Sequence, residues 1–584
     1  MPRDRSSRFG APLRWTVRVV ALVLVIWIIA SVVVLLRVRS SADAALDRLD
    51  TARENLSATA LLRGAGRDAL GAATSDFRTA HDRAGSPILA PWKVIPLASQ
   101  NVKSAEALTA AAAKVTAITE RAASKTSQLL KVSPTTGAER LALLQQLEHV
   151  SGRAADRLRD VDLGPDFFLV GPLGDARDRF IERLDQLRQA LRGARSLASG
   201  FEQLLRGPRR YLVLAANNGE MRAGSGMLLS AGVVTFQDGT FSVGSFEPSA
   251  DFNLPAGAVP VPPELDHLWG FLHPTQEWRN LASTPRFDVT APLAADMWRA
   301  ATGQTVDGVL AVDPATLRAL VAAQGPINVA GRDLTSDNVL GFLLRDQYAG
   351  VSIGDPQAAR RDVLGTVATA ALDTLQSRAW RSTDLVAQLG SAGTGRHILA
   401  WARDPKEEKA WAAGGIDGAL HADSLAVSLL NVGGNKLDQF VHVDAHLAVD
   451  ENDSGGHDVT VRVKISNEAP TGLPSYIAGP HPATDLEEGE YRAILSVNSP
   501  GAGSLPRISG LPRLLVAGID GPTKTAAAAD VQLARGATLT VTIRFQLPDG
   551  LDAMTVEPSA RIPPVTWTFG DRRFTDTHPE RLEW

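Results

Sequence analysis

The sequence of 584 residues contains no cysteine. This absence excludes a disulfide scaffold, a Cys-ligated zinc or iron–sulfur centre, and thiol catalysis. Lysine is scarce: only 10 of the 60 basic residues are Lys, and none lies between Lys131 and Lys406. Every basic residue between them is therefore Arg, whose guanidinium fork suits carboxylates and phosphates. With 44% hydrophobic and 21% charged residues, the composition is that of globular domains.

The longest apolar run is VVALVLVIWIIASVVVLL, residues 19–36. At about 1.5 Å of rise per residue it nearly crosses the ~30 Å hydrocarbon core of a bilayer, so we expect a transmembrane helix. The tail 1–18 carries five Arg and one Asp, whereas Arg37 and Arg39 are the basic residues that closely follow the run. The positive-inside rule then places the tail in the cytoplasm and the body outside, in a single-pass protein of the cell membrane. The SADAA sequence after the run leaves cleavage as a signal peptide open.

The body of the chain is acidic. Residues 1–40 hold 7 basic and 1 acidic side chains, which leaves 53 basic and 63 acidic residues in 41–584, a formal charge of −10. Nucleic-acid binders carry a basic surface for the phosphate backbone. We therefore expect no nucleic-acid partner.

Three patterns follow one another along the body. Residues 41–206 have apolar residues at helical spacing between proline breaks, which favours an intrachain bundle over a coiled-coil oligomer. Residues 209–430 alternate short apolar runs with helical patterns, and in 436–584 apolar and polar residues alternate strictly. The sequence thus predicts a multidomain chain: a basic tail (1–18), a transmembrane helix (19–36), a helical stalk or bundle (41–206), an α/β core (209–430) and an immunoglobulin-like antiparallel β-sandwich (436–584).

The densest polar cluster is NNGEMRAGSG, residues 217–226, directly after the first predicted strand of the α/β core. In open α/β sheets, ligands bind beyond the carboxyl ends of strands. Asn217, Asn218, Glu220 and Arg222 could offer amide, carboxylate and guanidinium groups there. A capped surface turn explains the same residues equally well, so both interpretations stay open.

Three segments in order resemble a known family: YLVLAANNGEMRAGSGM (211–227), VDGVLAVDPATLRALVAAQGPINVAGRDLTSDNV (306–339) and LLNVGGNKLDQF (429–440). They resemble the bacterial membrane-anchored family catalogued as domain of unknown function 4012, over about residues 170–580. This resemblance implies a membrane-anchored protein and assigns no activity.

A second resemblance is to the LytR-CpsA-Psr phosphotransferases. Their single span carries an external α/β domain that moves polyprenyl-pyrophosphate-linked glycan onto the cell wall. The segment TVDGVLAVDPATLRALVAAQGPINV (305–329) is similar to theirs, as are LLRDQY (343–348) and GDPQAARRDVL (354–364). The resemblance implies a LytR-CpsA-Psr-like core.

It also implies functional residues, with Mg²⁺ or Mn²⁺ as the metal that neutralises a transferring phosphoryl group. The implied pyrophosphate ligands are Arg222, Arg345 and Arg361, and the implied metal ligands are Asp251 and Asp355. The chain departs from that family at two places: FEPSADF (246–252) lacks its strand arginine, and Arg222 is followed by Ala-Gly where the family has Ser-Asp.

Two functions follow from these observations. The first is a cell-envelope protein that binds polyprenyl-pyrophosphate-linked glycan or transfers it as a metal-dependent phosphotransferase. The alternative is a noncatalytic envelope scaffold or partner-binding protein, which the departures favour. The sequence leaves open whether the protein is an enzyme and what its oligomeric state is.

Overall fold

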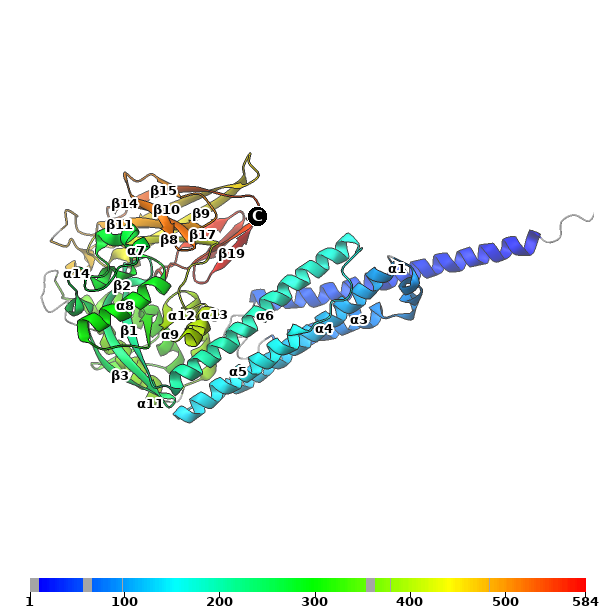
Figure 1. Ribbon diagram of the computed structural model, residues 1–584, viewed down its shortest axis with the longest axis horizontal. Coiled ribbons are helices and arrows are strands. Elements are labelled where there is room, and N and C mark those ends of the chain that lie inside the picture. The colour runs from blue at the N-terminus through cyan, green and yellow to red at the C-terminus, as the bar shows by residue number, and fades with distance from the viewer. Residues whose placement is uncertain (1–9, 56–65, 97, 353–362, 379, 483) are drawn as a thin grey trace, which may run out of the picture. The chain divides into compact units, whose positions relative to one another are not determined.

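The computed structural model describes residues 10–55, 66–96, 98–352, 363–378, 380–482 and 484–584 (Figure 1). The chain divides into two compact units. The first, or helical, unit comprises residues 1–130 and 146–195, and the second comprises residues 131–145 and 196–584.

The helical unit is built from long helices whose contacts are made by small side chains. Its elements are α1 (Gly10–Asn55), α3 (Arg67–Ala84), the 3-10 helix η1 (Pro87–Val94), α4 (Ala98–Leu129) and most of α5 (Gly137–Arg159) and α6 (Gly171–Arg206) (Figure 1). Ala45, Ala73 and Ala112 form one buried cluster with Phe77, which lets α1, α3 and α4 approach closely. The described part of 41–206 thus contains the predicted helices.

The first helix carries the apolar run. Among the described residues, one stretch is long and apolar enough to cross a membrane, Val25–Leu49, with a mean hydropathy of 1.9. It overlaps the predicted span 19–36. A stretch of this kind near the N-terminus is common to membrane anchors and signal sequences.

In the second unit the described residues form a five-stranded sheet in the order β3-β2-β1-β4-β7. β1 runs parallel to β4, and the other neighbours are antiparallel. The strands are β1 (Arg209–Met221), β2 (Gly226–Gln237), β3 (Thr240–Pro248), β4 (Gly308–Val312) and β7 (Ile398–Ala402).

Helices and a small hairpin surround this sheet. They are α7 (Pro263–Trp269), α8 (Phe287–Thr302), α9 (Pro314–Gln324), β5 (Ile327–Val329), β6 (Arg332–Leu334), α10 (Val339–Leu344), α11 (Val363–Ser377), α12 (Ser382–Thr394) and α13 (Pro405–Ala413). Asp313 caps α9: its carboxylate accepts from the Thr316 backbone N–H at 3.0 Å, and Pro314 occupies the first helical position. The strand-then-helix pattern read from the sequence is therefore correct here.

The remaining strands form two six-stranded sheets among the described residues, β12-β15-β10-β9-β17-β18 and β13-β14-β11-β8-β16-β19. Their bounds are β8 (Ser424–Asn431), β9 (Val441–Glu451), β10 (His457–Asn467), β11 (Tyr491–Pro500), β12 (Arg507–Ser509), β13 (Arg513–Asp520), β14 (Thr523–Leu533), β15 (Thr538–Leu547), β16 (Ala553–Val556), β17 (Thr566–Phe569), β18 (Arg572–Thr575) and β19 (Glu580–Glu583). Valines of β9 and β10 are buried in one cluster with Tyr491 and Trp567, so both sheets share a core.

Two expectations about this region need correction. The sheets are mixed rather than purely antiparallel, because β16 runs parallel to β8 and β17 runs parallel to β9. β8 lies, except for its last residue, in the range 209–430 that was predicted as α/β core, yet it pairs with β11. Leu430 of β8 and Ile494 of β11 also pack into the core cluster of β1 and α8, so the five-stranded sheet and the β11-containing sheet are joined through one apolar core.

Candidate functional site

The polar cluster after the predicted first strand is a continuation of that strand. β1 runs on to Met221, and Asn217, Asn218 and Glu220 are all buried within it. The Gly219 N–H donates to Asn217 Oδ1 at 2.8 Å. At the start of β2, a Cβ on Gly226 would lie 2.3 Å from the Asn217 backbone, so only glycine fits that approach. The cluster is thus a packed strand end and not a surface turn.

A cavity of about 130 Å³ opens at this end of β1, and we call it the β1-end cavity. Its walls come from segments far apart in the sequence. They are β1, β2, the end of β3, α11, the 3-10 helices η2 (Ser249–Phe252), η4 (Trp278–Ser283) and η5 (Asp346–Tyr348), the residue before η6 (Leu437–Phe440), and the short helix α14 (Ser475–Ala478). Its principal side chains are Asn217, Glu220, Arg279, Tyr348, Lys436 and Tyr476.

Lys436 is the buried cation of the cavity, with 3% of its surface exposed. It forms an ion pair with Glu220, and its ammonium lies 5.1 Å from the Tyr348 ring centroid and 5.2 Å from that of Tyr476. The two rings are stacked, with centroids 5.1 Å apart. Burial alone would lower the pKa of Lys436, but Glu220 and the two tyrosines raise it above its ordinary value. Lys436 therefore stays charged at neutral pH, held by a carboxylate and two aromatic faces.

A second cation stands at the mouth of the cavity. Arg279 is 45% exposed and pairs with Glu277 at 2.6 Å, and hydrogen bonding to Glu277 raises the pKa of Arg279. Inside, Asn217 Nδ2 donates to the Tyr348 hydroxyl at 3.1 Å. Because each cation has a carboxylate partner, the cavity is polar and aromatic without a large net charge. It suits a ligand with hydrogen-bonding groups around an apolar face.

Asn218 points away from the cavity. Its Nδ2 donates to Asp313 Oδ2 at 2.9 Å and to the Ala560 carbonyl at 2.8 Å. Asp313 Oδ2 also lies 2.6 Å from His397 Nδ1. Burial alone would lower the pKa of His397, but the charge and hydrogen bond of Asp313 raise it. Asn218 thus joins β1 to α9 and to the segment around residue 560.

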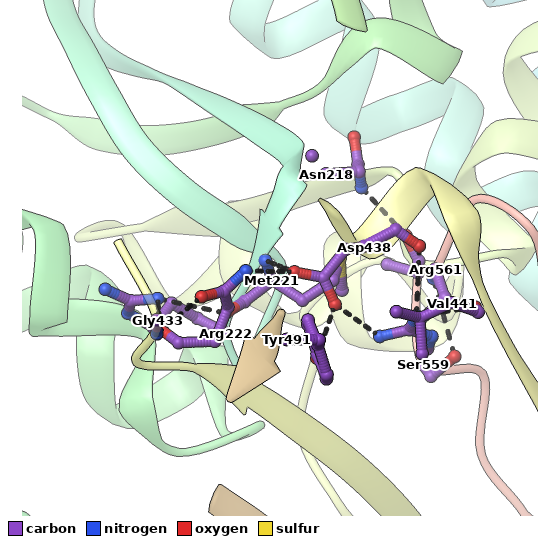
Figure 2. A network of polar contacts seen from close by, with 12 residues as sticks. Asn218, Met221, Arg222, Gly433, Asp438, Val441, Tyr491, Ser559 and Arg561 are labelled. Atoms are coloured by element: carbon purple, nitrogen blue, oxygen red, sulfur yellow. Dashed lines mark hydrogen bonds and ion pairs between the residues drawn. The ribbon is translucent and has the colours of Figure 1, made fainter. Parts of the chain in front are cut away.

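The guanidinium of Arg222 is hydrogen-bonded to other groups of the chain (Figure 2). Its guanidinium donates to the carbonyls of Arg279, Met221 and Asn431 and to Asn280 Oδ1, at 2.7–3.2 Å. Burial lowers the pKa of Arg222. These bonds direct the guanidinium of Arg222 mainly to backbone carbonyls and not into the β1-end cavity. The pyrophosphate contact of Arg222 stays a prediction.

Asp438 of η6 fixes the end of β1 (Figure 2). Its Oδ1 accepts from the Tyr491 hydroxyl and from Arg561 Nη1, both at 2.8 Å. Its Oδ2 accepts from Asn431 Nδ2 at 2.8 Å and from the Met221 N–H at 3.0 Å. One buried carboxylate therefore holds four segments together, directly behind the strand end that carries Glu220.

The other predicted residues do not gather at the cavity. Arg345 is exposed and pairs with Asp346 at 3.1 Å. Asp251 is exposed on η2 (Ser249–Phe252). Arg361 and Asp355 lie outside the described residues. Within the described ranges, no group of three or more His, Asp or Glu side chains is placed to hold a metal. Binding of Mg²⁺ or Mn²⁺ by Asp251 and Asp355 stays a prediction, because Asp355 lies outside the described residues.

Sequence reasoning therefore found two cavity residues, Asn217 and Glu220, and missed the others. Lys436 had a signal: it is an isolated lysine inside the segment LLNVGGNKLDQF. Arg279 and Tyr476 had no such signal in the sequence, because their place in the cavity depends on how segments distant in the sequence pack together.

Comparison with known proteins gives a family match. No curated protein and no solved structure matches the chain. Residues 206–348 match the model of a family described as "Protein of unknown function (DUF4012)", a shorter range than the expected 170–580. The similarity to the LytR-CpsA-Psr phosphotransferases is not shown. The matched range carries Asn217, Glu220, Arg279 and Tyr348 of the cavity. The match over residues 206–348 supports the DUF4012 family for this chain.

Proposed function

We propose that the chain is a membrane-tethered cell-envelope protein that binds a glycan at the β1-end cavity. The observation that carries this proposal is the stacked pair Tyr348 and Tyr476 around the Lys436–Glu220 ion pair. A sugar ring offers C–H faces that pack on aromatic rings, and hydroxyls that need donors and acceptors nearby. The cavity has both, and its size suits a single sugar residue rather than an extended chain.

The anchor supports the cellular location. The apolar stretch in α1 provides the tether, and the excess of arginine in 1–18 over the residues just after the run favours a cytoplasmic tail and an extracytoplasmic body. A glycan of the cell envelope would be met on that side of the membrane.

The glycan that we propose is linked to polyprenyl pyrophosphate. Arg279 is a half-exposed guanidinium at the mouth of the cavity, where a phosphate group next to the bound sugar could pair with it. We propose binding without transfer, because Arg222 is used by backbone carbonyls and Arg345 pairs with Asp346.

Binding to the full-length chain in lipid nanodiscs tests this function. The probe is a disaccharide linked to polyprenyl pyrophosphate, with phosphate release followed in the same samples. We expect saturable binding without phosphate release, and a tenfold loss of affinity in Arg279→Gln, which is about 1.4 kcal/mol. Tyr476→Leu should weaken binding to a similar degree.

Arg299→Gln is the matched control. Arg299 is another half-exposed arginine with an acidic partner, Asp296 at 3.8 Å, and it lies on α8 and not in the lining of the cavity. If Arg279→Gln and Arg299→Gln bind equally well, the cavity is not the site. If no variant and no wild-type protein binds, the noncatalytic scaffold replaces the glycan-binding function. Phosphate release by the wild type would contradict binding without transfer.

A further inference from the structure

The helical unit carries an apolar surface that its own core does not cover, and we call it the bundle tip, residues 87–96 and 166–170. In the first segment, PILAPWKVIP, Val94 is 82% exposed, and Ile88 and Ile95 are also exposed. In the second segment Phe168 is 73% exposed, with Phe167 and Val170 beside it. Exposed apolar side chains in such a group mark an interaction surface.

The two segments of the bundle tip lie next to one another. Asn101, in the second turn of α4, donates to the Phe168 carbonyl at 3.0 Å and accepts from the Val170 N–H at 2.8 Å. α4 begins at Ala98, directly after the first segment. Asn101 therefore holds residues 166–170 against the N-terminal end of α4, which residues 87–96 precede in the chain.

The bundle tip is attached to α1. Trp92 stacks on Trp27 with ring centroids 4.7 Å apart. Trp27 Nε1 donates to the Ile88 carbonyl at 2.8 Å, and Trp92 Nε1 donates to Ser31 Oγ at 3.0 Å. Further along the same helix, Val38 is buried against Ala80 and Ala84 of α3. α1 is thus an integral helix of this bundle and not a detached leader.

The contacts with Trp27 and Ser31 lie within the apolar part of α1. Exposed apolar side chains on α1 run from Val23 to Leu36, and Arg37 is the first charged residue after them. Trp27 and Ser31 precede Arg37 by ten and six residues, which is about 15 and 9 Å along a helix. The bundle tip therefore meets α1 alongside its apolar band, on the membrane side of Arg37.

Several polar groups in and around residues 87–96 are absent or already paired, as burial in an apolar medium requires. Pro87, Pro91 and Pro96 have no N–H that would need a partner there. Both indole N–H groups of the Trp27–Trp92 pair are hydrogen-bonded. The charged side chain of this segment, Lys93, pairs with Glu106 at 2.6 Å.

We propose that the bundle tip inserts into the leaflet on the body's side of the membrane, where lipid acyl chains cover Val94, Ile95, Phe167 and Phe168 beside α1. Interfacial segments bury apolar side chains about 5–10 Å below the headgroups. The Ser31 contact, about 9 Å before Arg37 along the helix, matches that depth, and the Trp27 contact, about 15 Å before Arg37, lies deeper. Asp166, which is exposed at the edge of the second segment, lies in the headgroup layer. This second attachment is independent of what the β1-end cavity binds.

The absence of cysteine allows a direct test with single-cysteine variants of the full chain. Val94→Cys and Phe167→Cys place a nitroxide label on each segment, and both side chains are exposed, so neither change opens a cavity in the buried core. Ala123→Cys, at an exposed position about seven turns after the start of α4, is the matched control. Each labelled chain is reconstituted into phosphatidylcholine vesicles, and collision with oxygen and with a neutral nickel chelate is measured by spin-label relaxation.

We expect the labels at 94 and 167 to lose collisions with the aqueous nickel chelate and to gain collisions with oxygen, which concentrates in the acyl region. The label at 123 should show the reverse. The proposal is overturned if the label at 94 or at 167 behaves like the label at 123. It is also overturned if the mass of the purified chain shows that α1 has been removed, because the tip would then have no helix beside it in the bilayer.

Discussion

The ion pair of Arg561 and Asp438 gives the sharpest test of how the second unit is held together. Arg561 is 3% exposed, and it donates to Asp438 Oδ1 and to the carbonyls of Asp438 and Val441. Replacing Arg561 by Met leaves a buried carboxylate that has lost its counter-charge. Removing one partner of a buried pair costs about 3–5 kcal/mol, a large share of a typical free energy of unfolding of about 5–15 kcal/mol.

A double variant separates the lost charge from the lost packing. In Arg561→Met with Asp438→Asn, the amide oxygen can accept from the Met221 N–H and Asn431, while the amide nitrogen donates to the Tyr491 hydroxyl. No uncompensated charge is left in the core. We therefore expect the double variant to lose less stability than Arg561→Met alone.

The assay is urea unfolding of the full chain followed by tryptophan fluorescence. Arg581→Met is the control: Arg581 is 58% exposed, pairs with Asp423 and Glu583, and should lose less than about 1 kcal/mol. If Arg561→Met costs no more than Arg581→Met, or if the double variant costs as much as Arg561→Met alone, the reasoning about this network is refuted.

Two further predictions concern the other buried pairs. The folded-state pKa of His397 is raised by Asp313, so protonation of His397 stabilises the fold fully below its unfolded pKa of about 6.5. Urea midpoints should fall as the pH rises through the raised pKa, and His397→Asn should flatten that dependence; an equally steep fall in His397→Asn would contradict the assignment. Lys436→Met leaves Glu220 buried without its cation and should lower the free energy of unfolding by about 3–5 kcal/mol, whereas adding Glu220→Leu should restore part of it. A loss below about 1 kcal/mol in Lys436→Met, measured by the same unfolding assay, would show that the pair is not isolated from water.

Local patterns in the sequence were sufficient for the elements themselves. Strict alternation from Val441 to Val449 predicted a strand with one buried face, and β9 has that burial pattern through Leu447. The Asp313-Pro314 dipeptide predicted the start of α9 correctly. These signals depend on neighbours within a few residues, so no information about packing was needed.

Contacts between distant segments could not be predicted in the same way. Arg222 was singled out by its position after a strand and, as a pyrophosphate ligand, by the LytR-CpsA-Psr resemblance. Its contact with the carbonyl of Asn431, 209 residues away, was in neither signal. A buried guanidinium and a ligand-binding one look alike in sequence. The parallel pairing of β16 with β8 is similarly hidden, because residue alternation shows which face is buried and not which strand lies next.

The carboxylate of Asp438 also bears on how the chain matures. A chain made from its N-terminus exposes residues 217–222 long before Arg561 exists, yet the backbone N–H of Met221 bonds the same carboxylate as Arg561. The carbonyl of Ala560 likewise receives the Asn218 amide. The buried network around residues 217–222 is therefore complete only once residues 560 and 561, more than 200 positions beyond residue 348, have been made. An expression fragment cut at the limits of the family match would lack these partners. The segment that matches the family, residues 206–348, is therefore shorter than the part of the chain that has to fold together.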